Sequence, residues 1–230
     1  MENESQNMKG GSKPNTEATV QYFIIAVLAI LLIYNGSRIY GAENSSLSGN
    51  VATGIAIASA LDILPKGIPE VYGTELKVSY NDVSVSNQAL AEKTMQKLSE
   101  YEDMELDNET MQRYISLGSS IACEYCCGAK TLIFSNGERA CGCAHSYAMR
   151  GLAKYLLTKH SDMTNVQILE ELAKWKVLFF PGIHEKKAQA LKDNGIDYTN
   201  FVNLASNLYR GAENQASVSS SGGSQMVGGC

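Results

Sequence analysis

The sequence predicts a mainly α-helical protein with an N-terminal transmembrane helix, followed by a helical domain that carries a small cysteine-rich β-hairpin. Three observations lead to this prediction. Residues 18–34 are apolar and uncharged, several later segments have apolar residues at helical spacing, and five of the six cysteines fall between Cys123 and His145. The formal net charge of −5 argues against a dedicated nucleic-acid binder, which needs a basic face.

The N-terminal region predicts a single-pass membrane anchor. Residues 18–34, "ATVQYFIIAVLAILLIY", are close to the shortest length that spans a bilayer. A polar tail at 1–17 precedes them, and a linker rich in Gly, Asn and Ser follows at 35–50. A cleaved signal peptide or a buried core helix is the alternative. We expect this chain to contact the membrane and a membrane-protein partner.

Positive charge on the two sides of the apolar segment indicates its orientation. Lys9 and Lys13 precede it, whereas Arg38 follows it. Because cytoplasmic flanks carry an excess of Lys and Arg, this distribution favours an extracytoplasmic soluble domain.

Residues 51–210 are predicted to form the mainly helical domain that holds the cysteine cluster. Alternation in "GTELKVSYNDVSVS" indicates a short strand or extended segment, and helical spacing begins after it. Residues 211–230 are rich in Ser and Gly and are predicted to be a disordered tail that ends in Cys230. The expected helix signals are the apolar face of residues 87–101, a cap at Asp107, a cap at Ser146, a capping box at Thr164 and Gln167, a stop at Pro181-Gly182, and a further helix closed by Gly195.

The cysteine cluster has two halves that flank a predicted β-hairpin. Between the halves, Thr131–Phe134 is β-prone and Asn136-Gly137 is typical of a two-residue turn. Such a hairpin is expected to bring Cys126 and Cys141 together at its base.

The ligand types in this cluster predict one metal ion, with zinc as the leading candidate. Zinc takes four sulfur or imidazole ligands, and copper(I) or an iron–sulfur cluster accepts similar donors. We expect Cys123, Cys126 and Cys141 to bind, with Cys143 or His145 completing the set. The full set of candidate metal ligands is Cys123, Cys126, Cys127, Cys141, Cys143 and His145.

Two other functions fit the same cysteines. The first is thiol–disulfide redox chemistry or metal transfer through Cys126-Cys127 or Cys141-Gly-Cys143, and the second is a structural component of a membrane assembly. No Ser/His/Asp set, phosphate loop or carboxylate pair stands out, so a binding or structural module is favoured over an enzyme. Outside the cluster, His160 and His184 are expected at the surface or at helix caps, and Arg150 and Lys154 on a solvated helix face.

Three segments resemble known proteins. "CEYCCGAKTLIF", "ACGCAHSYAMRGLAKYL" and "KWKVLFFPG" resemble an uncharacterised group of membrane-anchored, cysteine-rich archaeal proteins. The resemblance covers about residues 65–182 and implies a shared fold without an activity.

Two local motifs are also similar to known patterns. "CEYCCG" resembles a zinc-ribbon knuckle apart from the additional Cys127, whereas "CGC" is one residue shorter than the second knuckle of a ribbon. Residues 180–196 are similar to half of a helix-hairpin-helix, but His184 replaces its second glycine. Without that glycine the backbone does not approach a phosphate closely, so no nucleic-acid partner is predicted.

Overall fold

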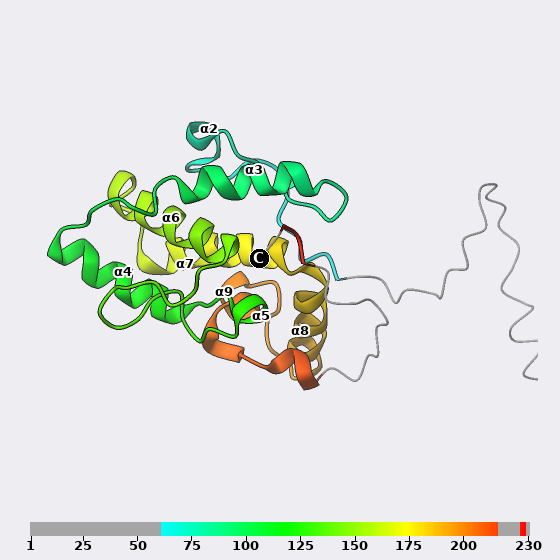
Figure 1. Cartoon of the computed structure of the whole chain (residues 1–230). Helices are drawn as coiled ribbons and strands as arrows, with labels where there is room; N and C mark the ends of the chain where they lie inside the picture. The colour runs from blue at the N-terminus through cyan, green and yellow to red at the C-terminus, as the bar shows by residue number, and fades with distance from the viewer. Residues whose placement is uncertain (1–60, 216–225, 229–230) are drawn as a thin grey trace, which may run out of the picture. The chain divides into compact units, whose positions relative to one another are not determined.

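The computed structural model describes residues 61–215 and 226–228, and this part of the chain is mainly α-helical (Figure 1). The predicted tail at 1–17, membrane helix at 18–34 and linker at 35–50 lie outside the described residues. Among the described helices, none has the length and apolar character needed to cross a bilayer. In chain order the elements are α2 (Gly73–Leu76), η1 (Tyr80–Asp82), α3 (Gln88–Ser99), α4 (Asn108–Ser120), α5 (Glu124–Cys127), α6 (Ala144–Lys159), α7 (Asn165–Phe179), α8 (Pro181–Asp193), α9 (Phe201–Ala205), η2 (Asn207–Tyr209) and η3 (Ala212–Gln215).

Helices α6 and α7 form the centre of the domain, and α3 and α4 both pack on α6 (Figure 1). The crossing of α3 and α6 depends on Gly151, because a Cβ at this position would lie 2.2 Å from the carbonyl oxygen of Leu98. The side chains of Leu152 and Trp175 are fully buried between the helices. Close packing in the middle of α6 therefore fixes the position of the helix, and the cysteine cluster lies at its first turn.

Local sequence patterns predicted the helix starts well. Asn87 caps α3, and Asp107 accepts a hydrogen bond from the backbone N–H of Thr110 at the start of α4. Thr164 and Gln167 form the expected capping box at the start of α7. The expected extended segment before α3 is wrong, since this region forms α2 and η1.

The predicted β-hairpin is also wrong for the described residues, where a single antiparallel bridge joins Ile133 to Arg139. The turn at Gly137 does form, with φ of 84°. Two hydrogen bonds accompany the bridge across the turn, from the N–H of Phe134 to the carbonyl of Glu138 at 2.8 Å and from the N–H of Ala140 to the carbonyl of Leu132 at 3.2 Å. The N–H of Leu132 instead donates to the carbonyl of Gly118 at 2.9 Å.

Arg150 is fully buried, which corrects the prediction of a solvated helix face. Its Nε donates to Glu102 at 2.7 Å, and its Nη1 donates to the carbonyl of Cys141 at 2.8 Å. Lys154, one turn later, is half-buried and donates to the carbonyl of Met104 at 2.9 Å. Arg150 therefore neutralises a buried carboxylate and also holds the loop that carries the second half of the cluster.

Glu102→Gln is expected to destabilise the domain by roughly 3–5 kcal/mol, because Arg150 would lose the counter-charge that compensates its burial. Chemical denaturation followed by circular dichroism measures this change. The matched control is Asp103→Asn, which removes a carboxylate that also pairs with Arg139 but is 88% exposed. Equal stability of the two variants would contradict a structural role for the Glu102–Arg150 pair.

Candidate metal centre

The first half of the cluster is a single helical turn. Cys123 is the N-cap of α5, and Gly128 ends the turn in the left-handed region with φ of 69°. Cys123 and Cys126 are three residues apart and therefore lie on one face of the turn. The next residue, Cys127, is exposed. The sequence "CEYCCG" thus directs two of its sulfurs inward and the third toward the surface.

Lys176 holds this turn against α7. The ammonium is fully buried, donates to Glu124 at 2.9 Å, and also donates to the carbonyl of Ala205 at 2.8 Å. Burial lowers the pKa of Lys176, while the carboxylate of Glu124 opposes this shift. A positive charge therefore lies in the interior beside the first cysteine group, and no sequence pattern indicated it.

The second half of the cluster is at the first turn of α6. Cys143 is the N-cap, and its sulfur accepts a hydrogen bond from the backbone N–H of Ser146 at 3.4 Å. The prediction that Ser146 caps this helix is therefore wrong, because the cap lies three residues earlier and is a cysteine. His145 is the second residue of α6 and is fully buried.

The sulfurs of Cys123 and Cys143 form a buried hydrogen-bonded pair, with an Sγ–Sγ distance of 3.3 Å. Because the backbone N–H of Ser146 favours negative charge on Cys143, we assign Cys143 as the thiolate and Cys123 as the donating thiol. The hydrogen bond from Cys123 lowers the pKa of Cys143 well below its ordinary value, and the hydrogen bonds from Ser146 act in the same direction. The same hydrogen bond, together with burial, raises the pKa of Cys123 well above its ordinary value.

His145 has one nitrogen without a partner. Its Nε2 donates to the carbonyl of Val227 at 2.8 Å, whereas its Nδ1 is buried with no hydrogen-bond partner. The ring packs against Phe179 and Phe180, with centroid distances of 5.0 and 4.9 Å. A carbonyl accepts only, so Nε2 carries the proton and Nδ1 presents a lone pair, which is the usual state of a metal-binding histidine.

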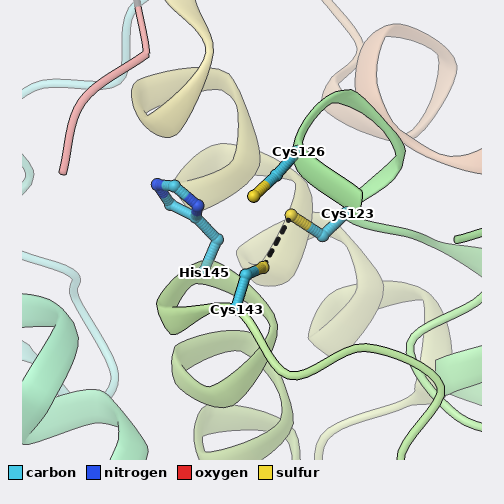
Figure 2. A group of neighbouring side chains, drawn as sticks. All are labelled: Cys123, Cys126, Cys143 and His145. Carbon is cyan, nitrogen blue, oxygen red and sulfur yellow. Dashed lines mark hydrogen bonds between the residues drawn. The ribbon is translucent and has the colours of Figure 1, made fainter. Parts of the chain in front are cut away.

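Ligand atoms from Cys123, Cys126, Cys143 and His145 all lie within 4.8 Å of one another (Figure 2). Figure 2 shows α5 and the first turn of α6 presenting these side chains to one another. A tetrahedral zinc ion with sulfur ligands at about 2.3 Å requires sulfurs about 3.8 Å apart. The group could therefore hold a metal ion after small side-chain adjustments and reduction of Cys126, which is disulfide-bonded in this structure.

Cys141 lies outside this group, although the sequence predicted it as a ligand. It forms a disulfide with Cys127, and the sulfurs of Cys127, Cys141 and Cys143 lie within 4.8 Å of one another. The structure therefore brings together both Cys143 and His145, which the sequence offered as alternatives. Cys126 is also disulfide-bonded in this structure.

Two elements of the site were not predicted. Val227 is fully buried, and its N–H donates to the carbonyl of Phe179 at 2.9 Å, although its segment was expected to be disordered. His184, expected near the surface, is also fully buried, and its Nδ1 donates to the carbonyl of Phe180. Burial lowers the pKa of His184 well below its ordinary value. An apolar Met-Val pair within a Ser/Gly-rich tail was the available hint for Val227.

Comparison with known proteins identified no relative: no family model, no curated protein and no solved structure matches this chain. The resemblance to archaeal cysteine-rich proteins stays a prediction.

Metal-free protein is expected to keep one thiolate far below pH 9, because Cys143 is ionised in the folded state. Its lowered pKa contributes stability that is fully present above its ordinary value of 9.0 and is lost as the pH falls through the lowered pKa of the folded state. The raised pKa of Cys123 acts only above pH 9, so it does not affect this range. Thiolate absorption in the ultraviolet, recorded against pH, measures the ionised fraction.

Two variants test the assignment. Cys143→Ser should abolish this acid-stable absorption, and Ser146→Ala should raise its titration midpoint because one hydroxyl contact at 3.5 Å is lost. Absorption that appears only near pH 9 in the folded wild type would contradict the thiol–thiolate pair.

Proposed function

We propose that this protein is a membrane-anchored zinc-binding protein, and that zinc stabilises its soluble domain through Cys123, Cys126, Cys143 and His145. The observation that carries this proposal is the free, buried Nδ1 of His145 beside three cysteine sulfurs. A buried nitrogen without a partner is costly in an apolar interior, and a metal bond at this atom removes the cost. The sulfur of Cys126 is disulfide-bonded in this structure. Cys126 would therefore bind the ion only after this disulfide is reduced.

The donor set favours zinc in a structural role. Three thiolates and one imidazole form a closed tetrahedral set with no position left for a substrate. Cys123, Cys143 and His145 are all buried, so solvent has little access to the ion. Copper(I) is the alternative, because it also prefers soft sulfur ligands.

The electrostatic balance of the interior also supports a bound dication. Zinc with three thiolates and a neutral imidazole carries one net negative charge. Lys176 supplies a positive charge from within the same interior, and its charge interacts favourably with the Cys123 thiolate. Buried ions of opposite sign reduce each other's desolvation cost.

The predicted anchor at residues 18–34 places this domain beside a bilayer, and its flanking charges favour the extracytoplasmic side. A zinc-stabilised domain held there suits a binding or structural role in a membrane assembly. Thiol chemistry at the same cysteines is the second candidate, and the disulfide between Cys127 and Cys141 beside the free Cys143 favours it.

Full-length protein purified under reducing conditions should contain about one equivalent of zinc per chain. Elemental analysis measures the metal, and cobalt substitution reports tetrahedral sulfur ligation through its visible spectrum. Cys123→Ser and His145→Gln should each lose most of the metal because each removes one of the four donors.

Cys127→Ser is the matched control, since Cys127 belongs to the same turn but lies outside the group of four. It should retain zinc. Equal metal loss in Cys127→Ser and Cys123→Ser would assign the ion to a different ligand set, and metal-free protein with full helical content would overturn the proposal.

Truncation after Gln225 should weaken zinc affinity by roughly 10–100-fold, because the carbonyl of Val227 would no longer fix the proton on Nε2 of His145. Competition with a chromophoric chelator measures the affinity. Cys230→Ser keeps Val227 and controls for loss of the terminal thiol. Unchanged affinity in the truncated protein would show that Val227 does not orient the histidine.

A further inference from the structure

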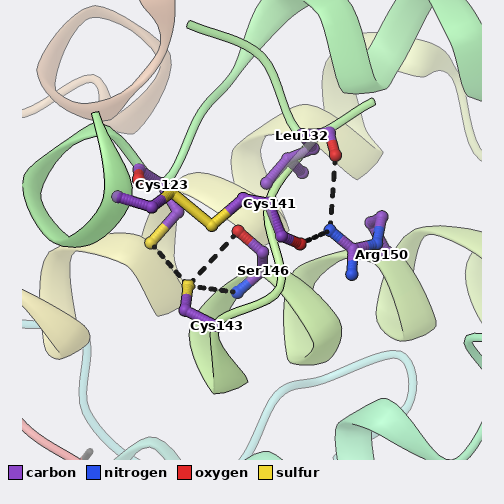
Figure 3. Close-up of a disulfide and its surroundings, with 7 residues drawn as sticks. Cys123, Leu132, Cys141, Cys143, Ser146 and Arg150 are labelled. Carbon is purple, nitrogen blue, oxygen red and sulfur yellow. Dashed lines mark hydrogen bonds between the residues drawn. A yellow bond between two sulfur atoms is a disulfide. The ribbon is translucent and has the colours of Figure 1, made fainter. Parts of the chain in front are cut away.

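Cys143 belongs to two groups of sulfurs at once. Its Sγ lies 3.3 Å from the Cys123 sulfur, and it lies within 4.8 Å of both sulfurs of the Cys127–Cys141 disulfide. Figure 3 shows the disulfide beside the two free cysteines, Cys123 at the start of α5 and Cys143 at the start of α6. Cys123 and Cys143 are the free cysteines among the described residues. The sulfur of Cys143 therefore belongs to the free pair and also lies next to the disulfide.

The two pairs differ in their access to solvent. Cys127 is exposed, whereas Cys123 and Cys143 are buried with 0% and 7% of their surface exposed. A redox partner in solution can therefore reach the Cys127 sulfur but has little access to Cys123 or Cys143.

The geometry points to an internal disulfide relay, in which the exposed Cys127–Cys141 disulfide is passed by thiol–disulfide exchange to the buried Cys123–Cys143 pair. This activity requires only the four cysteines and does not depend on a bound metal. Where the proposed zinc site is also present, the relay would remove two of its ligands, and this consequence alone rests on the proposed function.

In the first step the thiolate of Cys143 attacks the sulfur of Cys141. The Cys141–Cys143 disulfide forms, the Cys127–Cys141 bond breaks, and Cys127 leaves as a thiolate. Departure of Cys127 is favoured over departure of Cys141, because Cys127 is exposed and water solvates the leaving charge.

In the second step Cys123 attacks the sulfur of Cys143, 3.3 Å away. The Cys123–Cys143 disulfide forms, Cys141 leaves as a thiolate, and the proton of Cys123 passes to Cys127. The carbonyl of Cys123 lies 3.2 Å from the Cys127 sulfur and can accept a hydrogen bond from the new thiol. Both sides of the reaction contain one disulfide and two thiols, so the transfer needs no external oxidant.

The surface pair is then available for another cycle. A small-molecule disulfide accepts two electrons from Cys127 and Cys141, leaves as two thiols, and restores the Cys127–Cys141 bond. A small-molecule dithiol reverses the process by reducing the buried pair. The cluster would thus report the thiol redox state of its surroundings to the interior of the domain.

The test uses full-length protein carrying Cys126→Ser and Cys230→Ser, which leaves only Cys123, Cys127, Cys141 and Cys143. Its one-disulfide form is isolated in the Cys127–Cys141 state and incubated at neutral pH with a chelator and without external thiol. Acid quenching, alkylation and mass spectrometry identify the disulfides. The expected result is conversion to the Cys123–Cys143 form while the helical content is unchanged.

Two further variants in this background separate the steps. Adding Cys123→Ser should eliminate the Cys123–Cys143 form, trap Cys141–Cys143 and leave Cys127 open to alkylation. Adding Cys143→Ser should freeze the protein as Cys127–Cys141.

Persistence of the Cys127–Cys141 disulfide alone in the folded four-cysteine protein overturns the relay. Continued exchange after Cys143→Ser also overturns it, because Cys143 would then not be the shared sulfur. Conversion in a protein that never binds zinc supports the relay and rejects the proposed metal site, so the two proposals fail separately.

Discussion

The buried contact between Arg150 and Glu102 is the constraint on which the cysteine cluster depends. The loop between α5 and α6 has almost no strand pairing, so its backbone carbonyls need other partners in the interior. Arg150 supplies them at Leu132 and Cys141. Its charge is tolerated there because Glu102 pairs with it. One side chain therefore fixes the loop that carries the second half of the cluster against α6.

Lys176 positions the first half of the cluster in a similar way. Its contact with Glu124 ties the single turn of α5 to α7, which packs on α6 in turn. The two halves are thus positioned by two buried cations, each paired with a carboxylate 48 or 52 residues away in sequence. Such long-range pairs explain why a cysteine-rich segment with little secondary structure adopts a defined arrangement.

The helix caps of this structure could be predicted from the sequence. Caps at Asp107 and Thr164 depend on neighbouring residues alone, and the sequence shows them directly. The ligand set was harder, because Cys141 and His145 have equally suitable spacing and only tertiary contacts separate them. Arg150 illustrates the same difficulty, since a charged residue on an amphipathic helix is usually solvated, and its burial follows from a partner that periodicity does not reveal.

The position of Cys143 at a helix N-terminus suits its sulfur to two roles, metal binding and disulfide exchange. The same N–H of Ser146 that stabilises its thiolate prepares the sulfur to bind a metal and also to attack a disulfide. A sulfur held in a metal site has its lone pairs committed, and a sulfur in a disulfide cannot ligate as a thiolate. Metal binding and disulfide transfer are therefore mutually exclusive at this atom. Zinc would protect the buried pair from oxidation, and oxidation would exclude zinc, so a single sulfur would couple the metal content of the domain to its redox state.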